Sequence, residues 1–249
     1  MKIDFYYWSY QCPLNNTMIE LLKEYEDKLD IIYHDISKDF ILAQKMNMFF
    51  PTLTIVNDKH RYFAPVRRKF LNSLCNGEIP IERPYIPKLG ITKKNVILEP
   101  IRKSNYSIAG KCTGGECSKS CNKKIKFLED KDISILGYMN VDENNKLLGG
   151  VEYMPSLLIP YKIPKDDKTA FLTCVYISDS DFDYKSGPLT KLEDTLVLKY
   201  NKILVISDEK GIFPNGDLDF FIKNGYEDMG VISEEDNYCR LHLLCKYIK

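Results

Sequence analysis

A chain of 249 residues exceeds the usual size of a single domain, so we expect one large domain or two ordinary ones. The 35 basic residues balance the 35 acidic residues, which excludes the charge pattern of a general nucleic-acid-binding protein. No apolar run reaches transmembrane length, and the N-terminal stretch, with Asp4 and Glu20, lacks the basic start and apolar core of a signal peptide. We therefore expect a cytoplasmic protein with no membrane partner. In that compartment its eight cysteines are free thiols, redox groups or metal ligands rather than structural disulfides.

Strand and helix patterns alternate in the first part of the chain. A strand candidate at residues 2–8 precedes an amphipathic helix with an apolar stripe over residues 18–29. A second strand, a further helical segment and a strand entered through Pro51 follow. If the first helix begins at Pro13, Cys12 occupies its N-cap, where the helix amides and dipole favour a thiolate. Cys12 is therefore a candidate catalytic thiol, and the alternative is a scaffold whose cysteine is incidental.

This element order, with a cysteine at the helix start and a Phe-Phe-Pro-Thr strand, resembles the thioredoxin and glutaredoxin fold over residues 1–78. The resemblance implies that Pro51 faces Cys12. The second cysteine of that family is replaced here by Asn15, so only a one-cysteine mechanism with a mixed disulfide is compatible with the Cys-Pro-Leu-Asn sequence. Three prolines within residues 79–92 then predict an extended linker between two domains.

A predicted strand at NVILEPI opens the second domain, which we place at residues 93–249, and a cysteine cluster follows it. Cys112, Cys117 and Cys121 have the spacing C-x4-C-x3-C. Three soft ligands suit a metal site with zinc or an iron–sulfur cluster. Two alternatives are a substrate-facing thiol pair of Cys117 and Cys121, and small buried side chains around a glycine-rich turn.

The remaining elements surround one strand, loop and helix. Residues 134–141 and 146–153 alternate apolar and polar side chains and predict an antiparallel hairpin. Residues 170–177 predict a buried strand, and a helix with Pro188 at its first position follows the loop that contains Gly187. The unpaired amides and positive dipole end of such a helix favour a phosphate. A strand at KILVIS, a short helix ending at Gly225 and a strand at residues 238–247 complete the chain.

This order resembles the GNAT superfamily of acetyl-CoA-dependent N-acetyltransferases. The likeness is carried by GYMNVDENNKLLGGVEYMP, FLTCVYI, YKSGPL and FFIKNGYE. The predicted fold class is therefore α/β (α+β): a thioredoxin-like domain followed by a GNAT-like acyl-CoA N-acyltransferase domain with a mixed central sheet. The resemblance implies acetyl-CoA as cofactor and an amine of a small molecule or peptide as acceptor. It also implies cofactor binding by the strand amides near Val175, Tyr176 and Ile177 and by the loop of Lys185, Ser186, Gly187, Pro188 and Leu189.

The sequence departs from the family pattern at two places. Only the middle glycine of the family's phosphate loop is kept, since Pro188 removes an amide and Leu189 adds bulk, while Lys185 restores a charge. The tyrosine that protonates the leaving thiolate in the family aligns with Phe221, so Tyr176, Tyr184 or Tyr226 would have to replace it.

The transfer reaction needs a base for the amine, and two carboxylates are candidates. Glu152 at the hairpin end and Asp179 after the long strand are the residues we select. The alternative for both is a solvated loop acid. His242, on the final strand, is expected to be a packed histidine.

Three hypotheses follow from these patterns. The first is an N-acetyltransferase whose first domain binds or orients a thiol-bearing or peptide substrate. The second is a thiol-redox protein that uses Cys12 and the cluster at Cys112, Cys117 and Cys121. The third is a degenerate acetyltransferase fold that binds acyl-CoA or a metal without catalysis.

Overall fold

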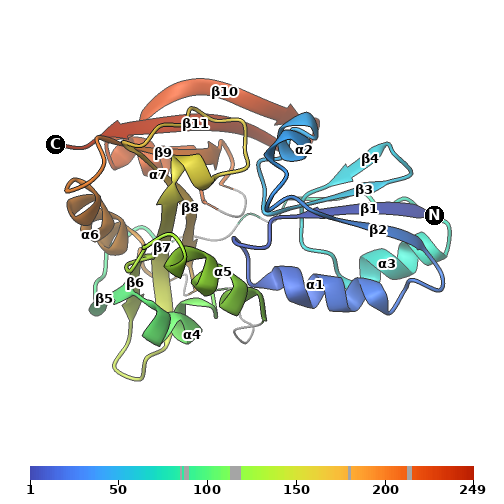
Figure 1. The fold of residues 1–249 in the computed structure, drawn as a ribbon, viewed down its shortest axis with the longest axis horizontal. Coiled ribbons are helices and arrows are strands. Elements are labelled where there is room, and N and C mark those ends of the chain that lie inside the picture. The colour runs from blue at the N-terminus through green and yellow to red at the C-terminus, as the bar shows by residue number, and fades with distance from the viewer. Residues whose placement is uncertain (85, 87–89, 113–118, 179–180, 212–214) are drawn as a thin grey trace. The chain divides into compact units, whose positions relative to one another are not determined.

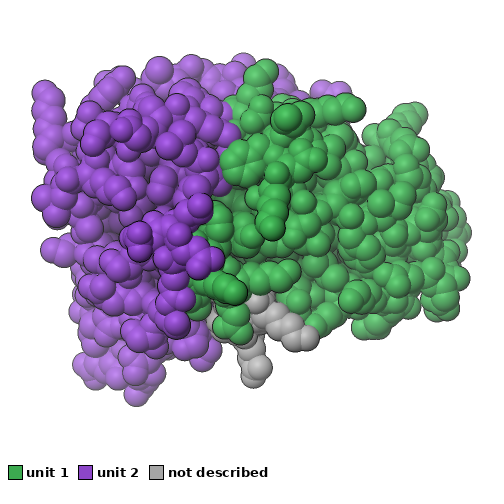
Figure 2. Space-filling model, viewed as in Figure 1, with its two compact units in different colours: residues 1–83, 117–127, 160–162 green, residues 84–116, 128–159, 163–249 purple. Residues whose placement is uncertain are grey.

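The computed structural model describes residues 1–249 except 85, 87–89, 113–118, 179–180 and 212–214, and it gives no side-chain placement for residues 119–121. The chain forms two compact units, which Figure 2 colours separately. Unit 1 comprises residues 1–83, 117–127 and 160–162, and unit 2 comprises residues 84–116, 128–159 and 163–249. The change between units at residues 83 and 84 falls inside the proline-rich stretch.

The first eighty or so residues of unit 1 contain a four-stranded sheet of order β2-β1-β3-β4 (Figure 1). Strand β1 is parallel to β2 and antiparallel to β3. The expected strands and helices are present in the expected order, and the short strand β4 was not predicted. The elements are β1 (Lys2–Tyr7), α1 (Leu14–Lys23), β2 (Asp30–Asp35), α2 (Phe40–Lys45), β3 (Thr52–Val56), β4 (His60–Tyr62) and α3 (Arg68–Cys75).

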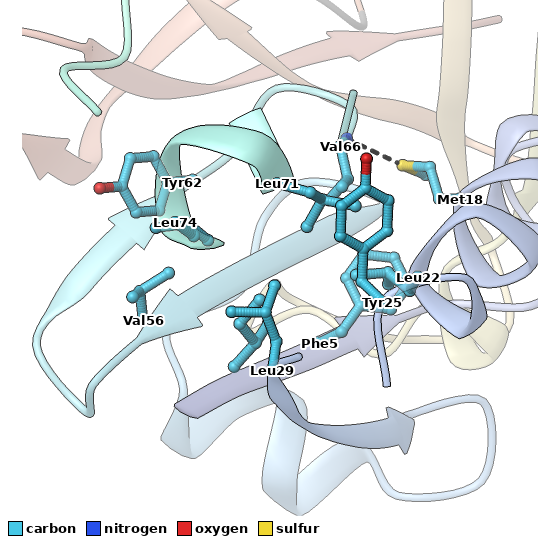
Figure 3. Packing of buried hydrophobic residues seen from close by; sticks show 11 residues of the cluster. Phe5, Met18, Leu22, Tyr25, Leu29, Val56, Tyr62, Val66, Leu71 and Leu74 are labelled. Atoms are coloured by element: carbon cyan, nitrogen blue, oxygen red, sulfur yellow. Dashed lines mark hydrogen bonds between the residues drawn. The ribbon is translucent and has the colours of Figure 1, made fainter. Parts of the chain in front are cut away.

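One apolar cluster joins the sheet of unit 1 to helices α1 and α3 (Figure 3). Phe5 of β1 and Leu22 of α1 are fully buried in it, as is Leu71 of α3. The backbone N–H of Val66 donates to Met18 Sδ at 3.3 Å at the edge of the cluster. Burying both helix stripes on one sheet face explains why the 3.6-residue periodicity was visible in the sequence.

Unit 2 is built on a seven-stranded mixed sheet of order β10-β11-β9-β8-β7-β6-β5. Its neighbouring strands are antiparallel apart from the parallel pair β8 and β9. The chain is thus a mixed α/β protein with a large mixed sheet. The predicted hairpin, long strand and following helix are all present, and strand β10 was not predicted. The elements of unit 2 are β5 (Ile97–Ile101), η1 (Lys103–Asn105), α4 (Tyr106–Ala109), β6 (Gly137–Val141), β7 (Leu147–Pro155), η2 (Ser156–Leu158), β8 (Thr169–Ile177), α6 (Ser186–Leu196), β9 (Lys202–Asp208), α7 (Leu218–Lys223), β10 (Glu227–Glu235) and β11 (Cys239–Tyr247). Helix α5 (Lys119–Glu129) lies between α4 and β6 in the sequence, and its residues up to 127 belong to unit 1.

Helices α4 and α6 contact opposite faces of this sheet. Tyr138 of β6 shares a hydrogen bond of 2.9 Å with Thr195 of α6. The neighbouring residue Gly137 pairs with Glu152 of β7, whose carboxylate contacts Tyr106 of α4. Since adjacent strand residues point to opposite faces, the α6 side and the α4 side are distinct environments. None of the described helices is both long and apolar enough to cross a bilayer.

Candidate functional site

Strands β8 and β9 begin as a regular parallel pair and then part. The ladder pairs Thr169 with Lys202 and ends at Phe171 with Leu204. Further along, the amide of Val175 donates to Asn215 Oδ1 at 3.2 Å, and Asn215 Nδ2 donates to the carbonyl of Ile206 at 2.8 Å. We call this region, residues 172–177 and 205–208, the β8/β9 opening. The side-chain amide of Asn215, which is 5% exposed, spans it in place of main-chain pairing.

Two of the three amides predicted to polarise a carbonyl point from β8 toward β9, and the third, of Tyr176, points toward β7. The amide of Ser178 bonds to Leu148 of β7. Because amides alternate in direction along an antiparallel strand, those of Val175 and Ile177 face β9 and the opening. Tyr176, between them, contributes its side chain on the α4 face instead.

A buried acid and two tyrosines meet on the α4 face. The Tyr106 hydroxyl donates to Glu152 Oε2 at 3.3 Å, and Glu152 is 3% exposed on strand β7. The interpretation of Glu152 as a solvated loop acid was therefore wrong. The Tyr176 hydroxyl lies above Gly150, 2.6 Å from the place where a Cβ would be, and accepts or donates no hydrogen bond among the described residues.

The pKa of Tyr176 is raised well above that of a free phenol. Burial is the main cause, and the charges of Glu152 and Cys112 add to it. Burial disfavours the phenolate, and a neighbouring carboxylate disfavours it further. Tyr176 therefore stays protonated and can donate its proton to a group that enters beside Glu152.

Several other predicted residues cannot be placed with this cluster. Asp179 lies outside the described residues, as does Cys117, and the side chain of Cys121 is not described. Cys112 is half-buried and follows α4. Within the described part of the chain, no group of three or more His, Cys, Asp or Glu side chains could hold a metal ion. The three-cysteine metal site stays a prediction.

The predicted phosphate-binding amides at the start of α6 are already occupied. Asp183 Oδ1 accepts from the amides of Lys185 at 3.0 Å and Ser186 at 3.1 Å, and Asp183 Oδ2 accepts from the Ser186 hydroxyl. The helix begins at Ser186, so Pro188 is its third residue and not its first as predicted. The first helical amides have no partner within the helix, so a proline is tolerated at either position. Sequence reasoning missed Asp183, although an Asp shortly before a helix start is a common capping signal.

The side chains of Lys185, Pro188 and Leu189 in this loop are buried. The Lys185 ammonium lies 3.7 Å from the centre of the Phe220 ring, and the residue is 3% exposed. Burial lowers the pKa of Lys185 to about 8, although the charges of Asp217 and Asp183 oppose this. Pro188 and Leu189 are buried. A Cβ at Gly187 would lie 2.0 Å from Asn95 Oδ1, so the loop is closely packed there.

The other two proposed proton donors lie elsewhere. Tyr226 packs edge-on against Phe221 with ring centres 5.3 Å apart, and its hydroxyl is beside Glu193. Tyr184 is buried and packs against Phe182. Tyr176 is thus the candidate that lies beside the acid Glu152.

Cys12 in unit 1 is 5% exposed. Helix α1 begins at Leu14 with Pro13 as its N-cap, so Cys12 lies one residue before the N-cap and not at it as predicted. Residues 119–127 and 160–162 of unit 1 cover its loop: Lys124 Nζ donates to the carbonyl of Gln11 at 3.4 Å, and the Tyr161 hydroxyl donates to the Gln11 side chain. A buried thiol reacts with a disulfide of another protein only after local opening, so the redox hypothesis is not supported.

No protein-family model and no curated protein sequence matches the chain. Similar solved structures include an aminoglycoside 6'-N-acetyltransferase from Enterococcus faecium, 13% identical over 62% of this chain and 98% of that one, with a TM-score of 0.46. An N-acetyltransferase from Staphylococcus aureus is 14% identical over 63% of this chain and 100% of that one, with a TM-score of 0.44. A spermidine/spermine N-acetyltransferase from Vibrio cholerae is 11% identical over 61% and 95%, with a TM-score of 0.41. Similarities of this size assign no family, activity or substrate to this chain.

Proposed function

We propose that unit 2 is a GNAT-like N-acyltransferase that takes an acetyl group from acetyl-CoA and transfers it to an amine of a small molecule or peptide. The observation that carries the proposal is the β8/β9 opening, because the amide of Val175 faces it and donates to a side chain, that of Asn215. A thioester arm that displaces the Asn215 amide can accept the same hydrogen bond. The buried groups Glu152 and Tyr176 lie on the neighbouring face of β7 and β8.

Each of these groups has a role in the proposed reaction. The amide of Ile177 polarises the thioester carbonyl, and Glu152 takes the proton of the attacking amine. The Tyr176 phenol, which its raised pKa keeps protonated, donates a hydrogen bond to the thiolate that leaves, and that thiolate recovers the proton held by Glu152. These steps need no group other than the donor thioester and the acceptor amine.

The α6 loop supports only weak binding of the nucleotide end. Lys185, Ser186, Gly187, Pro188 and Leu189 would hold the diphosphate, but the Asp183 carboxylate occupies the amides of two of them. Most of the donor's affinity must therefore come from its pantetheine arm. The same carboxylate favours the second candidate, a non-catalytic fold that binds acyl groups. For unit 1 we propose a thioredoxin-like domain that binds or orients the acceptor.

An acyl-transfer assay with two donors tests the proposed function. The purified chain is mixed with acetyl-CoA or with S-acetyl-N-acetylcysteamine, which has no phosphate, and with a panel of polyamines and peptide amines. We expect thiol release that depends on both enzyme and amine, and its loss in Glu152→Gln. Binding of either donor should also raise the melting temperature. The proposal fails if neither donor shifts the melting temperature and no amine increases thiol release.

A further inference from the structure

Cys174 on β8 lies directly opposite Glu152 on β7. The two residues are register partners in the antiparallel ladder, and the register shifts between Glu152 and Tyr153, so that the ladder passes from Cys174 to Leu172. Bulges of this kind re-aim side chains and are frequent next to active sites. Directly opposed side chains in such a ladder have Cβ atoms roughly 4.5–5.5 Å apart, which brings a carboxylate within reach of a thiol.

The surroundings of Cys174 differ from those of the other strand cysteines. Cys174 is half-buried, whereas Cys239 and Cys245 of β11 are buried. Tyr176 and Cys174 are two residues apart on β8 and pair with Gly150 and Glu152 of β7, so the side chains of Cys174, Tyr176 and Glu152 lie on the same face of the sheet. The buried Tyr176 hydroxyl forms no hydrogen bond within the described chain and is available to a group that enters.

The thiol is also next to the proposed donor position. The amide of Val175, the residue after Cys174, faces the β8/β9 opening. A thioester held by that amide is therefore bound at the residue next to Cys174 in the sequence. A base, a thiol and a buried hydroxyl donor in this arrangement are the components of covalent acyl transfer.

We propose that Cys174 is the nucleophile of the transfer and carries the acyl group as an enzyme thioester before the amine receives it. This inference rests on the proposed function and adds a covalent step to it. Glu152 takes the thiol proton, and Cys174 Sγ attacks the thioester carbon. The bond to the donor sulfur breaks, and that thiolate recovers the proton. The amine then attacks the Cys174 thioester, forms the amide and returns its proton to the cysteine, so no oxidant or reductant is required.

Mass spectrometry of the full chain tests the step directly. The protein is incubated with S-acetyl-N-acetylcysteamine without amine, quenched in acid, and analysed intact and as peptides. We expect one acetyl group on the peptide that contains Cys174, removable by neutral hydroxylamine as a thioester. The adduct should be absent in Cys174→Ala and kept in Cys112→Ala and in Cys75→Ala, which removes an exposed thiol of unit 1. Adding an acceptor amine should discharge it.

Peptide mapping locates the acetyl group in the wild-type chain, so the test does not depend on whether Cys174→Ala folds. Acetylation on another residue, or none at all, overturns the role of Cys174. If amine-dependent thiol release persists in Cys174→Ala without an adduct, the proposed function stands and transfer is direct. If the wild-type chain shows neither an adduct nor amine-dependent thiol release, the proposed function fails too.

Discussion

At the scale of single residues, Asp183 determines what the start of α6 can bind. Its carboxylate accepts from two main-chain amides and a hydroxyl, so the positive end of the helix dipole is already neutralised. A diphosphate placed there meets a like charge. The same residue stabilises the helix start, so its charge and its capping role must be separated by experiment.

Asp183→Asn separates them. An Asn side-chain oxygen can still accept from the amides of Lys185 and Ser186, while the negative charge is gone. We expect acetyl-CoA to bind roughly two- to fivefold more tightly, equivalent to about 0.5–1 kcal/mol, with no change for the phosphate-free donor. Asp194→Asn, an exposed acid in the same helix, is the control. Equal tightening for both donors in titration calorimetry would contradict this account.

Lys185 makes stability depend on pH. Its folded pKa of about 8 lies below the ordinary lysine value of 10.5. Between these pH values the unfolded chain binds a proton that the folded chain does not, so this group makes stability rise with pH through that window. Below it, the buried charge costs on the order of 3 kcal/mol.

Lys185→Met removes this dependence. We expect the variant to be more stable than the wild type near neutral pH and to lose that advantage as pH rises toward the upper end of the window. Urea unfolding of both proteins at two pH values measures the difference. A constant difference at both pH values would show that Lys185 keeps its ordinary pKa.

At the scale of elements, the β6–β7–β8 strands position the candidate site through close contacts at two glycines. A Cβ at Gly137 would lie 1.9 Å from the backbone oxygen of Val151, beside Glu152. A Cβ at Gly150 would meet the Tyr176 hydroxyl at 2.6 Å, which is the end of a side chain. The first contact is with rigid backbone and the second with a group that can turn.

Two alanine substitutions distinguish these contacts. Gly137→Ala must part β6 from β7 and should cost roughly 1–3 kcal/mol of unfolding free energy. Gly150→Ala should cost less but displace Tyr176 and lower the rate of acyl transfer. Chemical denaturation and the transfer assay report the two effects separately. An unchanged midpoint for Gly137→Ala would contradict the observed register.

The elements that the sequence predicted well are those whose pattern is local. The alternation around DENN predicted the β6–β7 hairpin, and the leucine stripe predicted the sheet-facing side of α6. Strand β10 was missed because its sequence, EDMGVISEE, is acidic and mostly exposed and lacks clear alternation. Asn215 was missed because its role depends on Val175 and Ile206, which only the folded sheet brings to it. The pairing of Cys174 with Glu152 was missed for the same reason, because only the folded sheet brings these two residues together.

At the scale of the whole molecule, the two compact units do not follow the sequence order. Unit 1 takes residues 117–127 and 160–162 from the second half of the chain. Tyr10 stacks on Phe127 with ring centres 4.1 Å apart, and Trp8 packs edge-on against Tyr161. These contacts bury the loop that carries Cys12. No pattern in the first eighty residues predicts them.

This cover should control the reactivity of Cys12. We expect alkylation of Cys12 in the native protein to be at least about tenfold slower than that of the exposed Cys75, because a buried thiol reacts only after local opening. Tyr161→Ala should raise the rate at Cys12, whereas Tyr161→Phe keeps the ring and should raise it less. Peptide-resolved labelling measures each site. Rapid labelling of Cys12 in the wild type would show that the cover does not protect it.

The most direct test of the central claim follows the Val175 amide in a nuclear magnetic resonance titration with S-acetyl-N-acetylcysteamine. If the thioester arm replaces the Asn215 side chain in the β8/β9 opening, the backbone amide of Val175 and the side-chain amide of Asn215 should shift together and saturate with one affinity. If both resonances stay in place at donor concentrations that support acyl transfer or raise the melting temperature, the thioester binds elsewhere and the proposed site is wrong.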